Sequence, residues 1–316
     1  MDIQSVCIIG GTGFVGRSIA EQAVARGLRV RVVTRSEPRA RKLLVLPTLE
    51  VMVADPHAEK ALERAFDDMD AVVNLAGILH EGGHASFERV HAELSRKIVK
   101  ACHASGVQQL LHMSALGADP QGPSKYQRSK AAGESVVREA GAPLAWTIFR
   151  PSVIFGEHDR FLNLFASLVR LFPVVPLGGA HARFQPVWVE DVARAFVGSL
   201  GDAEMAGRTI ALCGPRAYTL AQLVEFVAST LVRHPRIVPL APAAASLQAF
   251  FLEHLPGKLM TRDNLASMRV DNVCADPWPQ RLGFEPTSLE AVVPEYLGDV
   301  TSRAKYPRYR YFAGRG

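Results

Sequence analysis

The stretch that decides the fold is residues 5–35, which read SVCIIGGTGFVGRSIAEQAVARGLRVRVVTR. The apolar run at residues 5–9 is typical of a strand that is buried on both faces. After the glycines, apolar residues recur at helical spacing from Val15 to Val24, and Gly27 ends the helix. A second β-branched run follows almost at once. The stretch therefore predicts a strand, a glycine loop, a helix and a second strand.

Glycines occupy the first, fourth and seventh places of the loop at residues 10–16. A strand that leads into a helix through such glycines lets the backbone approach a pyrophosphate and points free N–H groups at it. No Gly-Lys-Ser or Gly-Lys-Thr follows, which excludes the phosphate loop of nucleoside triphosphatases. The sequence therefore predicts a dinucleotide site whose loop residues are Gly10, Thr12, Gly13, Phe14, Val15 and Gly16.

The end of the second strand indicates which dinucleotide binds. In such folds an acidic residue about 20 residues beyond the glycines normally binds the ribose 2′-hydroxyl. Here Arg35 occupies that place, and a guanidinium would pair with a 2′-phosphate instead. We therefore expect NADP(H) to be preferred, with NAD(H) as an alternative. Arg39, Arg41 and Lys42 lie close behind, and the alternative is a solvated basic loop without a ligand.

Later strand ends add candidate cofactor contacts. Asp55 follows the third apolar run and would either reach the adenine edge or cap the turn at Pro56. The fourth run leads into small residues that would let the backbone lie against the cofactor. The further cofactor-binding residues that we expect are Asp55, Leu75, Ala76, Gly77, Tyr126, Lys130 and Pro151.

Six apolar runs alternate with helical patterns in the first half of the chain. They lie at residues 5–9, 30–34, 49–54, 70–75, 109–113 and 144–149. The alternation predicts an α/β Rossmann fold, a doubly wound parallel sheet with right-handed crossovers. Beyond Gly156 the pattern changes, which predicts a smaller, mostly helical C-terminal lobe. We expect a nucleotide-binding Rossmann domain at 1–155 with 186–200 packed back on it, a substrate or partner lobe at 156–185 and 201–300, and a basic aromatic tail at 301–316.

The excess positive charge lies at one end of the chain. The net charge is +5, from 36 basic and 31 acidic residues, and residues 302–316 contain five basic residues and no acid. The remaining 31 basic residues match the 31 acids, so nucleic-acid binding is not expected. The tail would either bind an anionic membrane surface or only aid solubility. We expect a cytoplasmic protein without a signal or transit peptide, bound peripherally at the inner face of the membrane if the tail is an anchor.

The cysteines and one histidine pattern bear on metals and redox state. Cys7, Cys102, Cys213 and Cys274 are scattered, which favours a reducing compartment and core thiols over a disulfide framework. Residues 80–84 read HEGGH, which matches the zinc-protease pattern in its letters. That chemistry needs both imidazoles on one helix face, and two adjacent glycines after a strand predict a loop. We expect no metal.

Ser114, Tyr126 and Lys130 form a candidate catalytic group. Ser114 follows the fifth apolar run, and Ser124 would cap a helix on which Tyr126 and Lys130 share one face. An ordinary phenol, with a pKa near 10, is a poor acid–base group at neutral pH. A lysine one turn away, together with a nicotinamide cation, would lower that pKa, while the serine would orient a carbonyl. An exposed helix face with an unused tyrosine is the alternative.

These motifs together resemble a known family. The glycine loop, residues 74–77, Ser114 and the Tyr126/Lys130 pair resemble the extended and atypical short-chain dehydrogenase/reductases. Longer stretches resemble the dehydrogenase-like accessory subunit of respiratory complex I and its stand-alone bacterial relatives, within the NAD-dependent epimerase/dehydratase superfamily. Those stretches are residues 114–118, 126–134, 150–156, 159–163, 261–264 and 271–273. The resemblance covers roughly residues 3–295 and implies NADP(H) binding, although the mitochondrial subunit is regarded as structural.

Three functions are compatible with this resemblance. The first is an NADPH-preferring oxidoreductase linked to quinone or respiratory-chain metabolism, acting on a small apolar carbonyl or quinone-like substrate. The second is a non-catalytic, nucleotide-stabilised accessory subunit or assembly factor, whose partner belongs to complex I or a quinone-biosynthesis complex. The third is a nucleotide-sugar epimerase or dehydratase, which would favour an acid where Arg35 stands. The helix before the fifth strand has His91 in the region where many catalytic members keep an asparagine, which puts the usual proton relay in question.

Overall fold

The centre of the molecule is a seven-stranded parallel sheet. The computed structural model describes residues 1–83, 85–255 and 259–298. Within them the strand order is β11-β6-β5-β4-β1-β2-β3, and every neighbouring pair is parallel. The strands are β1 (Ser5–Ile9), β2 (Arg29–Thr34), β3 (Leu49–Val53), β4 (Ala71–Asn74), β5 (Gln109–Met113), β6 (Ala145–Pro151) and β11 (Arg208–Leu212). The predicted Rossmann fold is confirmed.

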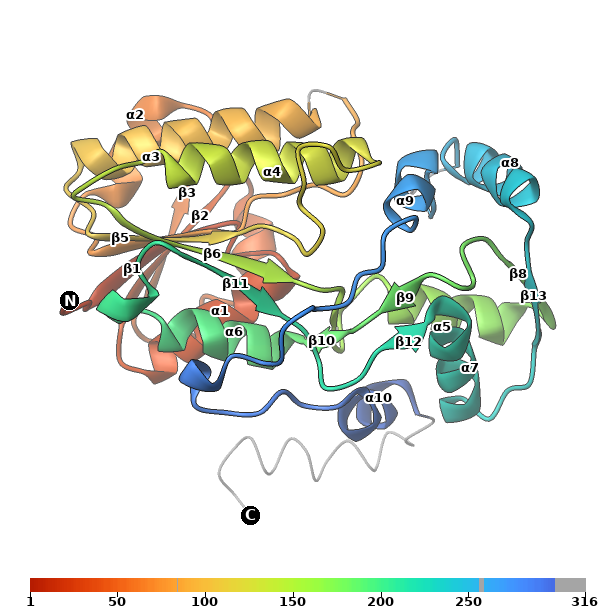
Figure 1. Ribbon diagram of the computed structural model, residues 1–316. Helices are drawn as coiled ribbons and strands as arrows, with labels where there is room; N and C mark the ends of the chain where they lie inside the picture. The colour runs from red at the N-terminus through yellow and green to blue at the C-terminus, as the bar shows by residue number, and fades with distance from the viewer. Residues whose placement is uncertain (84, 256–258, 299–316) are drawn as a thin grey trace, which may run out of the picture.

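Helices cover both faces of this sheet (Figure 1). One face carries α1 (Phe14–Ala25) and α6 (Val189–Gly198), which pack on each other. The other carries α2 (Glu59–Phe66), α3 (Leu94–Ala104) and α4 (Lys125–Arg138). The side chains of β1 enter the two cores on the two faces of the sheet alternately. This is why the strand has no polar face.

The last strand of the sheet comes from the part of the chain that we expected in the second lobe. β11 pairs with β6, and its residues Ile210 and Leu212 are buried. Both belong to the core that α1 and α6 cover. A short segment of this kind can be predicted as a strand, but its sequence carries no information about which sheet it joins. The expected lobe at 201–300 therefore lends one strand to the nucleotide-binding sheet.

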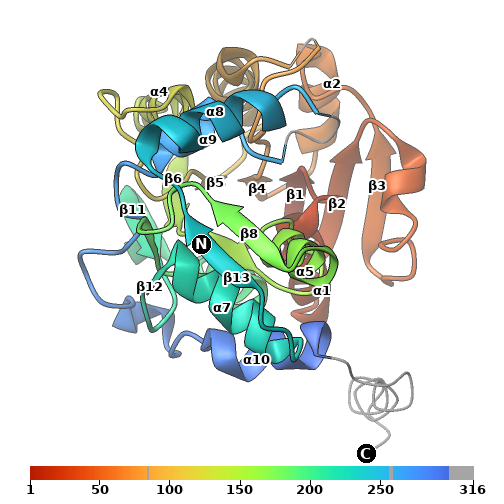
Figure 2. The ribbon, with the colours of Figure 1, turned by 90° about the vertical axis from the view of Figure 1, so that its right-hand side faces the viewer.

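The C-terminal lobe is built mainly from helices, with a core of its own. α5 packs on α7, and α8 packs on α9 at the outer edge of the lobe (Figure 2). The helices are α5 (Leu162–Leu171), α7 (Leu220–Thr230), α8 (Pro242–Leu252), α9 (Arg262–Ser267) and α10 (Leu289–Leu297). Paired short strands are β7 (Ile154–Phe155) with β10 (Val187–Trp188), β9 (Arg183–Phe184) with β12 (Tyr218–Thr219), and β8 (Val174–Leu177) with β13 (Arg236–Pro239). Short turns of helix are η1 (Glu37–Ala40), η2 (Glu88–Glu93), η3 (Ala203–Met205) and η4 (Gln280–Leu282).

The cysteine prediction is wrong for one pair. Cys213 and Cys274 form a disulfide across a sequence separation of 61 residues. Cys213 follows β11, and the chain returns beside it at Cys274, a contact that residue spacing does not reveal. Cys7 and Cys102 are free, buried thiols, as expected, and burial raises the pKa of Cys7 to about 12.

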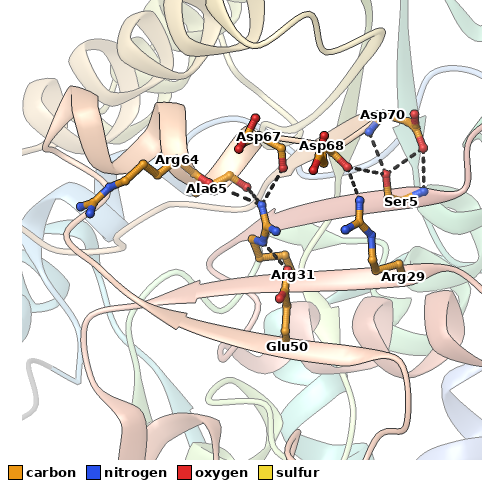
Figure 3. A network of polar contacts seen from close by, with 9 residues as sticks. All are labelled: Ser5, Arg29, Arg31, Glu50, Arg64, Ala65, Asp67, Asp68 and Asp70. Carbon is orange, nitrogen blue, oxygen red and sulfur yellow. Dashed lines mark hydrogen bonds and ion pairs between the residues drawn. The ribbon is translucent and has the colours of Figure 1, made fainter.

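A polar network ties the strands together at the edge where they begin (Figure 3). The Arg31 guanidinium donates to the carbonyl oxygens of Ala65 at 2.9 Å and Asp67 at 2.8 Å, and its Nε pairs with Glu50. The Asp70 carboxylate accepts from the backbone N–H of Ser5 at 2.9 Å and from its hydroxyl at 2.8 Å. These bonds fix the turn between α2 and β4 against β1 and β2.

Two features of the chain bear on membrane binding, namely its helices and its C-terminal tail. Among the described residues, no helix has the length and apolar character needed to cross a bilayer. The basic aromatic tail at 301–316 lies outside the described residues.

Candidate nucleotide and catalytic site

The glycine loop follows β1 at the carboxyl edge of the sheet. Gly10 has φ +86°, and a Cβ there would lie 3.2 Å from the carbonyl carbon of Leu75. A Cβ at Gly16 would lie 2.5 Å from the Gly10 oxygen, so both positions require glycine. Gly13 forms the N-cap of α1, is exposed, and no side chain caps that helix end. Backbone N–H groups at an open helix terminus suit a pyrophosphate.

The other loop residues contribute in different ways. Thr12 and Phe14 are half-buried, while Val15 is buried in the core beneath the sheet. Phe14 lies against Gly156, where a Cβ would come within 3.1 Å of the phenylalanine ring. Phe14 thus connects the loop to the start of the C-terminal lobe.

The end expected to receive the adenosine is electropositive. Arg35 follows β2 and is exposed, and it forms no hydrogen bond or ion pair with the described residues. Burial lowers the pKa of His57, and the nearby positive charges of Arg89, Lys97 and Arg35 lower it further, against the opposing charge of Asp55. This surplus of cations suits a phosphate group. One oxygen of Asp55 accepts from the His57 backbone N–H at 3.1 Å and closes the turn after β3.

The chain after β4 runs from the glycine loop towards Lys130. The Leu75 N–H donates to the Ile9 carbonyl at 3.0 Å, and the Ala76 N–H donates to the Asn74 side chain at 3.1 Å. A Cβ at Gly77 would lie 3.4 Å from the Lys130 Nζ atom. The structure therefore brings the segment 75–77 between the loop and the candidate catalytic lysine.

Two of the candidate catalytic residues, Ser114 and Lys130, are placed at the end of β5. Lys130 is buried, and its ammonium donates to the Met113 carbonyl at 3.0 Å, one residue before Ser114. Burial lowers the pKa of Lys130 to about 8, against the charge of Glu134, which raises it. The Ser114 hydroxyl oxygen is buried and has no hydrogen-bond partner within the described part of the chain. A buried, unpartnered hydroxyl is costly, so it marks a place where a ligand oxygen would be stabilised.

Tyr126 lies in the first turn of α4, where Ser124 caps the helix as predicted. The Ser124 hydroxyl accepts from the Gln127 N–H at 3.0 Å. Burial raises the pKa of the Tyr126 phenol to about 12. The polypeptide by itself therefore does not supply the lowering that we expected from Lys130, because desolvation is the sole cause of the shift and the lysine is bound to a carbonyl.

His91 completes the surroundings of Tyr126. Its Nε2 atom accepts from the Ile78 N–H at 3.1 Å, and Nδ1 lies 2.8 Å from the Ser129 hydroxyl oxygen. The Ser129 hydroxyl donates to the Tyr126 carbonyl at 2.8 Å, so Nδ1–H is the donor to Ser129. Burial, with the charge of Lys130, lowers the pKa of His91 to about 2, so the ring is neutral. It meets the Tyr126 ring edge-on, with centroids 5.7 Å apart.

Pro151 and the loop beyond it are held by the C-terminal segment. Pro151 is buried at the end of β6, and its carbonyl accepts from the Leu116 N–H at 2.9 Å. The Asn272 side chain accepts from the Ser152 hydroxyl at 2.6 Å and the Val153 N–H at 3.1 Å. We did not predict a positioning role for Asn272. The one sequence signal was its place in the 271–273 motif shared with the family.

No group of histidine, cysteine or acidic side chains among the described residues is arranged to hold a metal ion. In the HEGGH pattern, residues 80–83 are irregular, and His84 lies outside the described residues.

Comparison with known proteins identifies the class of protein. Residues 10–160 match the family model described as NAD(P)H-binding. The chain is 32% identical over 308 residues to subunit 9 of the NADH dehydrogenase [ubiquinone] 1 alpha subcomplex of Arabidopsis thaliana, covering 92% of this chain and 76% of the relative. It is 30% identical over 241 residues to the ceramide reductase of Caulobacter vibrioides, covering 74% and 73%.

Among solved structures, the fold is similar to the NADPH-dependent quinone oxidoreductase of Escherichia coli in complex with NADPH. The TM-score is 0.74, the identity 18%, and the match covers 91% of this chain and 98% of that one. Fold and site define an NAD(P)H-binding protein of the short-chain dehydrogenase/reductase type. Within that class, the chain belongs to the family of the alpha-subcomplex subunit 9 of NADH dehydrogenase [ubiquinone].

Proposed function

We propose that this protein is an NADPH-preferring oxidoreductase that reduces a small apolar carbonyl or quinone-like compound in quinone or respiratory metabolism. The observation that carries the proposal is the unpartnered, buried Ser114 hydroxyl at the end of β5, next to the carbonyl that holds Lys130. The names of a ceramide reductase among the relatives and a quinone oxidoreductase among the fold neighbours support a reductase.

The chain offers contacts for each part of the cofactor. The glycine loop would hold the pyrophosphate, Arg35 the 2′-phosphate, and residues 75–77 with Pro151 the nicotinamide half. NADPH, when bound, supplies a hydride. Lys130 would bind the nicotinamide ribose, because its buried ammonium is the nearest cation to Gly77.

The protonation states favour the direction of reduction. Since the pKa of Tyr126 is raised to about 12, the phenol carries its proton at neutral pH and would donate it to the substrate oxygen. The Ser114 hydroxyl would orient the same oxygen by a hydrogen bond. The reverse reaction needs the phenolate, which burial disfavours.

A non-catalytic role is the second candidate. Relatives that match over most of their length are named as subunits of a respiratory enzyme. In addition, His91 lies in the region where many catalytic members keep an asparagine, and its neutral ring bonds to Ile78 and to Ser129 of α4. As an accessory subunit or assembly factor, the protein would use the nucleotide as a stabilising ligand. A nucleotide-sugar epimerase is disfavoured by Arg35, since such enzymes usually retain NAD.

Tyr126→Phe separates the first two roles, because it removes the transferable proton and little else. For an enzyme, NADPH oxidation by a panel of apolar aldehydes, ketones and benzoquinones should fall by about 10²–10⁴ in kcat, with NADPH affinity retained. Ser114→Ala is the companion variant and should raise KM as well. Turnover that is unchanged in Tyr126→Phe removes the tyrosine from the mechanism.

The accessory role makes the opposite prediction for the same panel. The accessory role is supported if the unmodified protein oxidises NADPH with none of these compounds, while Gly13→Val abolishes nucleotide binding and lowers the melting temperature. Gly198→Ala is the control for glycine replacement, because Gly198 is exposed, its φ is not left-handed, and a Cβ there meets nothing within 4 Å.

A further inference from the structure

Helix α8 presents an apolar face that nothing in the described chain covers. Its outward positions 243, 247, 250 and 251 follow helical spacing, and position 254 continues it just beyond the helix end. Leu247 is 59% exposed, Phe250 42% and Phe251 62%. Leu255 and Leu259, beyond the end of the helix, are also exposed, at 50% and 44%. We call these five side chains the α8 face.

The opposite side of the helix is fixed to the lobe. Ala245 and Ala249 are buried, and Gln248 bonds to the backbone on both sides of Leu177. Its side-chain amide donates to the Pro176 carbonyl at 2.8 Å, and its oxygen accepts from the Gly178 N–H at 3.3 Å. The buried alanines and the two bonds of Gln248 therefore hold the apolar face outward.

The exposed polar groups of residues 242–255, and Arg262 beside them, are neutral or basic. Residues 242–255 contain one acid, Glu253, whose side chain is 16% exposed and is paired with Arg262 at 2.7 Å. The Arg262 side chain is 61% exposed and its guanidinium lies over the Phe250 ring, 5.2 Å from the centroid. Ser246 and His254 are the other exposed polar side chains of this stretch. Within residues 242–255, no exposed carboxylate would meet an anionic surface.

The size of the α8 face argues against a folded partner. Scaling the exposed fractions by roughly 200 Å² for a large apolar side chain gives about 500 Å². A stable protein interface, including one with a second copy of this chain, needs about 800 Å² on each side. A single helix face of this size is what an interfacial helix inserts at the boundary between headgroups and acyl chains.

We propose that the α8 face docks the C-terminal lobe on an anionic phospholipid bilayer, with α8 lying in the plane of the membrane surface. Leu247 and Phe251 enter the acyl layer, and Arg262 remains at the headgroups. This contact is independent of the tail at 302–316 and of the catalytic role of Tyr126.

The test is flotation of the full-length protein with phosphatidylcholine/phosphatidylglycerol vesicles. At roughly 1 M salt the Debye length is about 3 Å, so binding through exposed charges is suppressed and binding through inserted side chains persists. The unmodified protein should keep a salt-resistant bound fraction. The double variant Leu247→Glu/Phe251→Glu should lose this fraction by at least about tenfold, because two large apolar side chains no longer enter the acyl layer.

The matched control is Leu44→Glu/Val45→Glu, which places the same charges on exposed apolar residues of another surface, 55% and 81% exposed. It should float like the unmodified protein. NADPH affinity and melting temperature verify folding in each variant, and Phe251→Ser serves as a milder change. The proposal is overturned if no salt-resistant fraction exists or if the α8 variants keep it. A dimer of the unmodified protein that the α8 variants dissociate in sedimentation also overturns it, because a second copy then covers the face.

Discussion

The carboxylate of Asp263 accepts a hydrogen bond from the backbone N–H of Tyr126 at 3.1 Å, across 137 residues of sequence. Its other oxygen accepts from the Lys125 N–H at 2.7 Å. With Ser124 bonded to the Gln127 N–H, the first three N–H groups of α4 all have partners. A carboxylate at this end also interacts favourably with the helix dipole. The C-terminal lobe thus sets the position of the helix that carries Tyr126 and Lys130.

Asp263→Ala should lower the free energy of unfolding by about 1–2 kcal/mol, because two N–H groups and the helix dipole lose their partner. Thermal or urea unfolding measures this. Asp263→Asn keeps an acceptor oxygen without the charge, so its loss should be smaller. If the protein is an enzyme, kcat should fall more than NADPH affinity in both. Equal stability of all three proteins would show that the contact contributes nothing.

Arg35→Asp should remove the preference for NADPH. A charge-assisted hydrogen bond is worth about 1.5–3 kcal/mol, so NADPH affinity should weaken by about 10- to 100-fold, with NADH affinity unchanged or improved. Calorimetry with both nucleotides measures it. Arg39→Asp, the same charge change at another exposed arginine four residues on, is the control and should leave the ratio intact. Equal affinities for the two nucleotides in the unmodified protein would falsify the assignment.

Removing the basic tail should abolish the salt-sensitive part of membrane binding. Residues 302–316 hold five basic residues and four aromatic ones, and each basic residue near an anionic leaflet is worth about 1 kcal/mol. A protein ending at Thr301 should float with anionic vesicles less than the full chain at low salt, because only the α8 face still binds the vesicles. It should still bind NADPH. If it floats as well as the full chain at low salt, the tail only aids solubility.

Local patterns were enough to predict much of the fold and part of the geometry of the candidate site. The strand, loop and helix at residues 5–25 obey steric rules that act within a few residues, and so does the Ser124 cap. The spacing of Tyr126 and Lys130 likewise follows from helical geometry. Such features are encoded where they occur, so a single sequence indicates them.

Contacts between distant segments could not be predicted in the same way. The Cys213–Cys274 disulfide and the bonds from Asp263 to α4 join parts of the chain that neither periodicity nor spacing relates. The place of β11 in the large sheet depends on the return of the chain after α6. The raised pKa of Tyr126 also depends on burial by tertiary packing, and Lys130 does not oppose it because its ammonium bonds to the Met113 carbonyl.

The network around Asp70 makes a prediction about acid stability (Figure 3). Burial raises the pKa of this carboxyl, but hydrogen bonds from Ser5 and from the Gln4 N–H outweigh it, so the pKa lies below its ordinary value. A depressed folded-state pKa means that the carboxylate stabilises the fold above the unfolded pKa of about 4. The stabilisation is lost as the pH falls through the folded value.

Asp70→Asn should therefore lower the free energy of unfolding by about 1–2 kcal/mol at neutral pH, since charge-assisted bonds become neutral or are lost. The difference from the unmodified protein should shrink as the pH is lowered below about 4, because the native carboxyl is then protonated as well. Urea unfolding at several pH values measures it. Asp68→Asn is the matched control, since it removes the same charge two residues away. Asp68 enters the network through its carbonyl oxygen, and asparagine tolerates its left-handed φ of 58°. If the free energy of unfolding of Asp70→Asn differs from that of the unmodified protein by the same amount from neutral pH to pH 2, the charge of Asp70 is not the cause. The effect then comes from the changed shape and hydrogen bonding of the side chain.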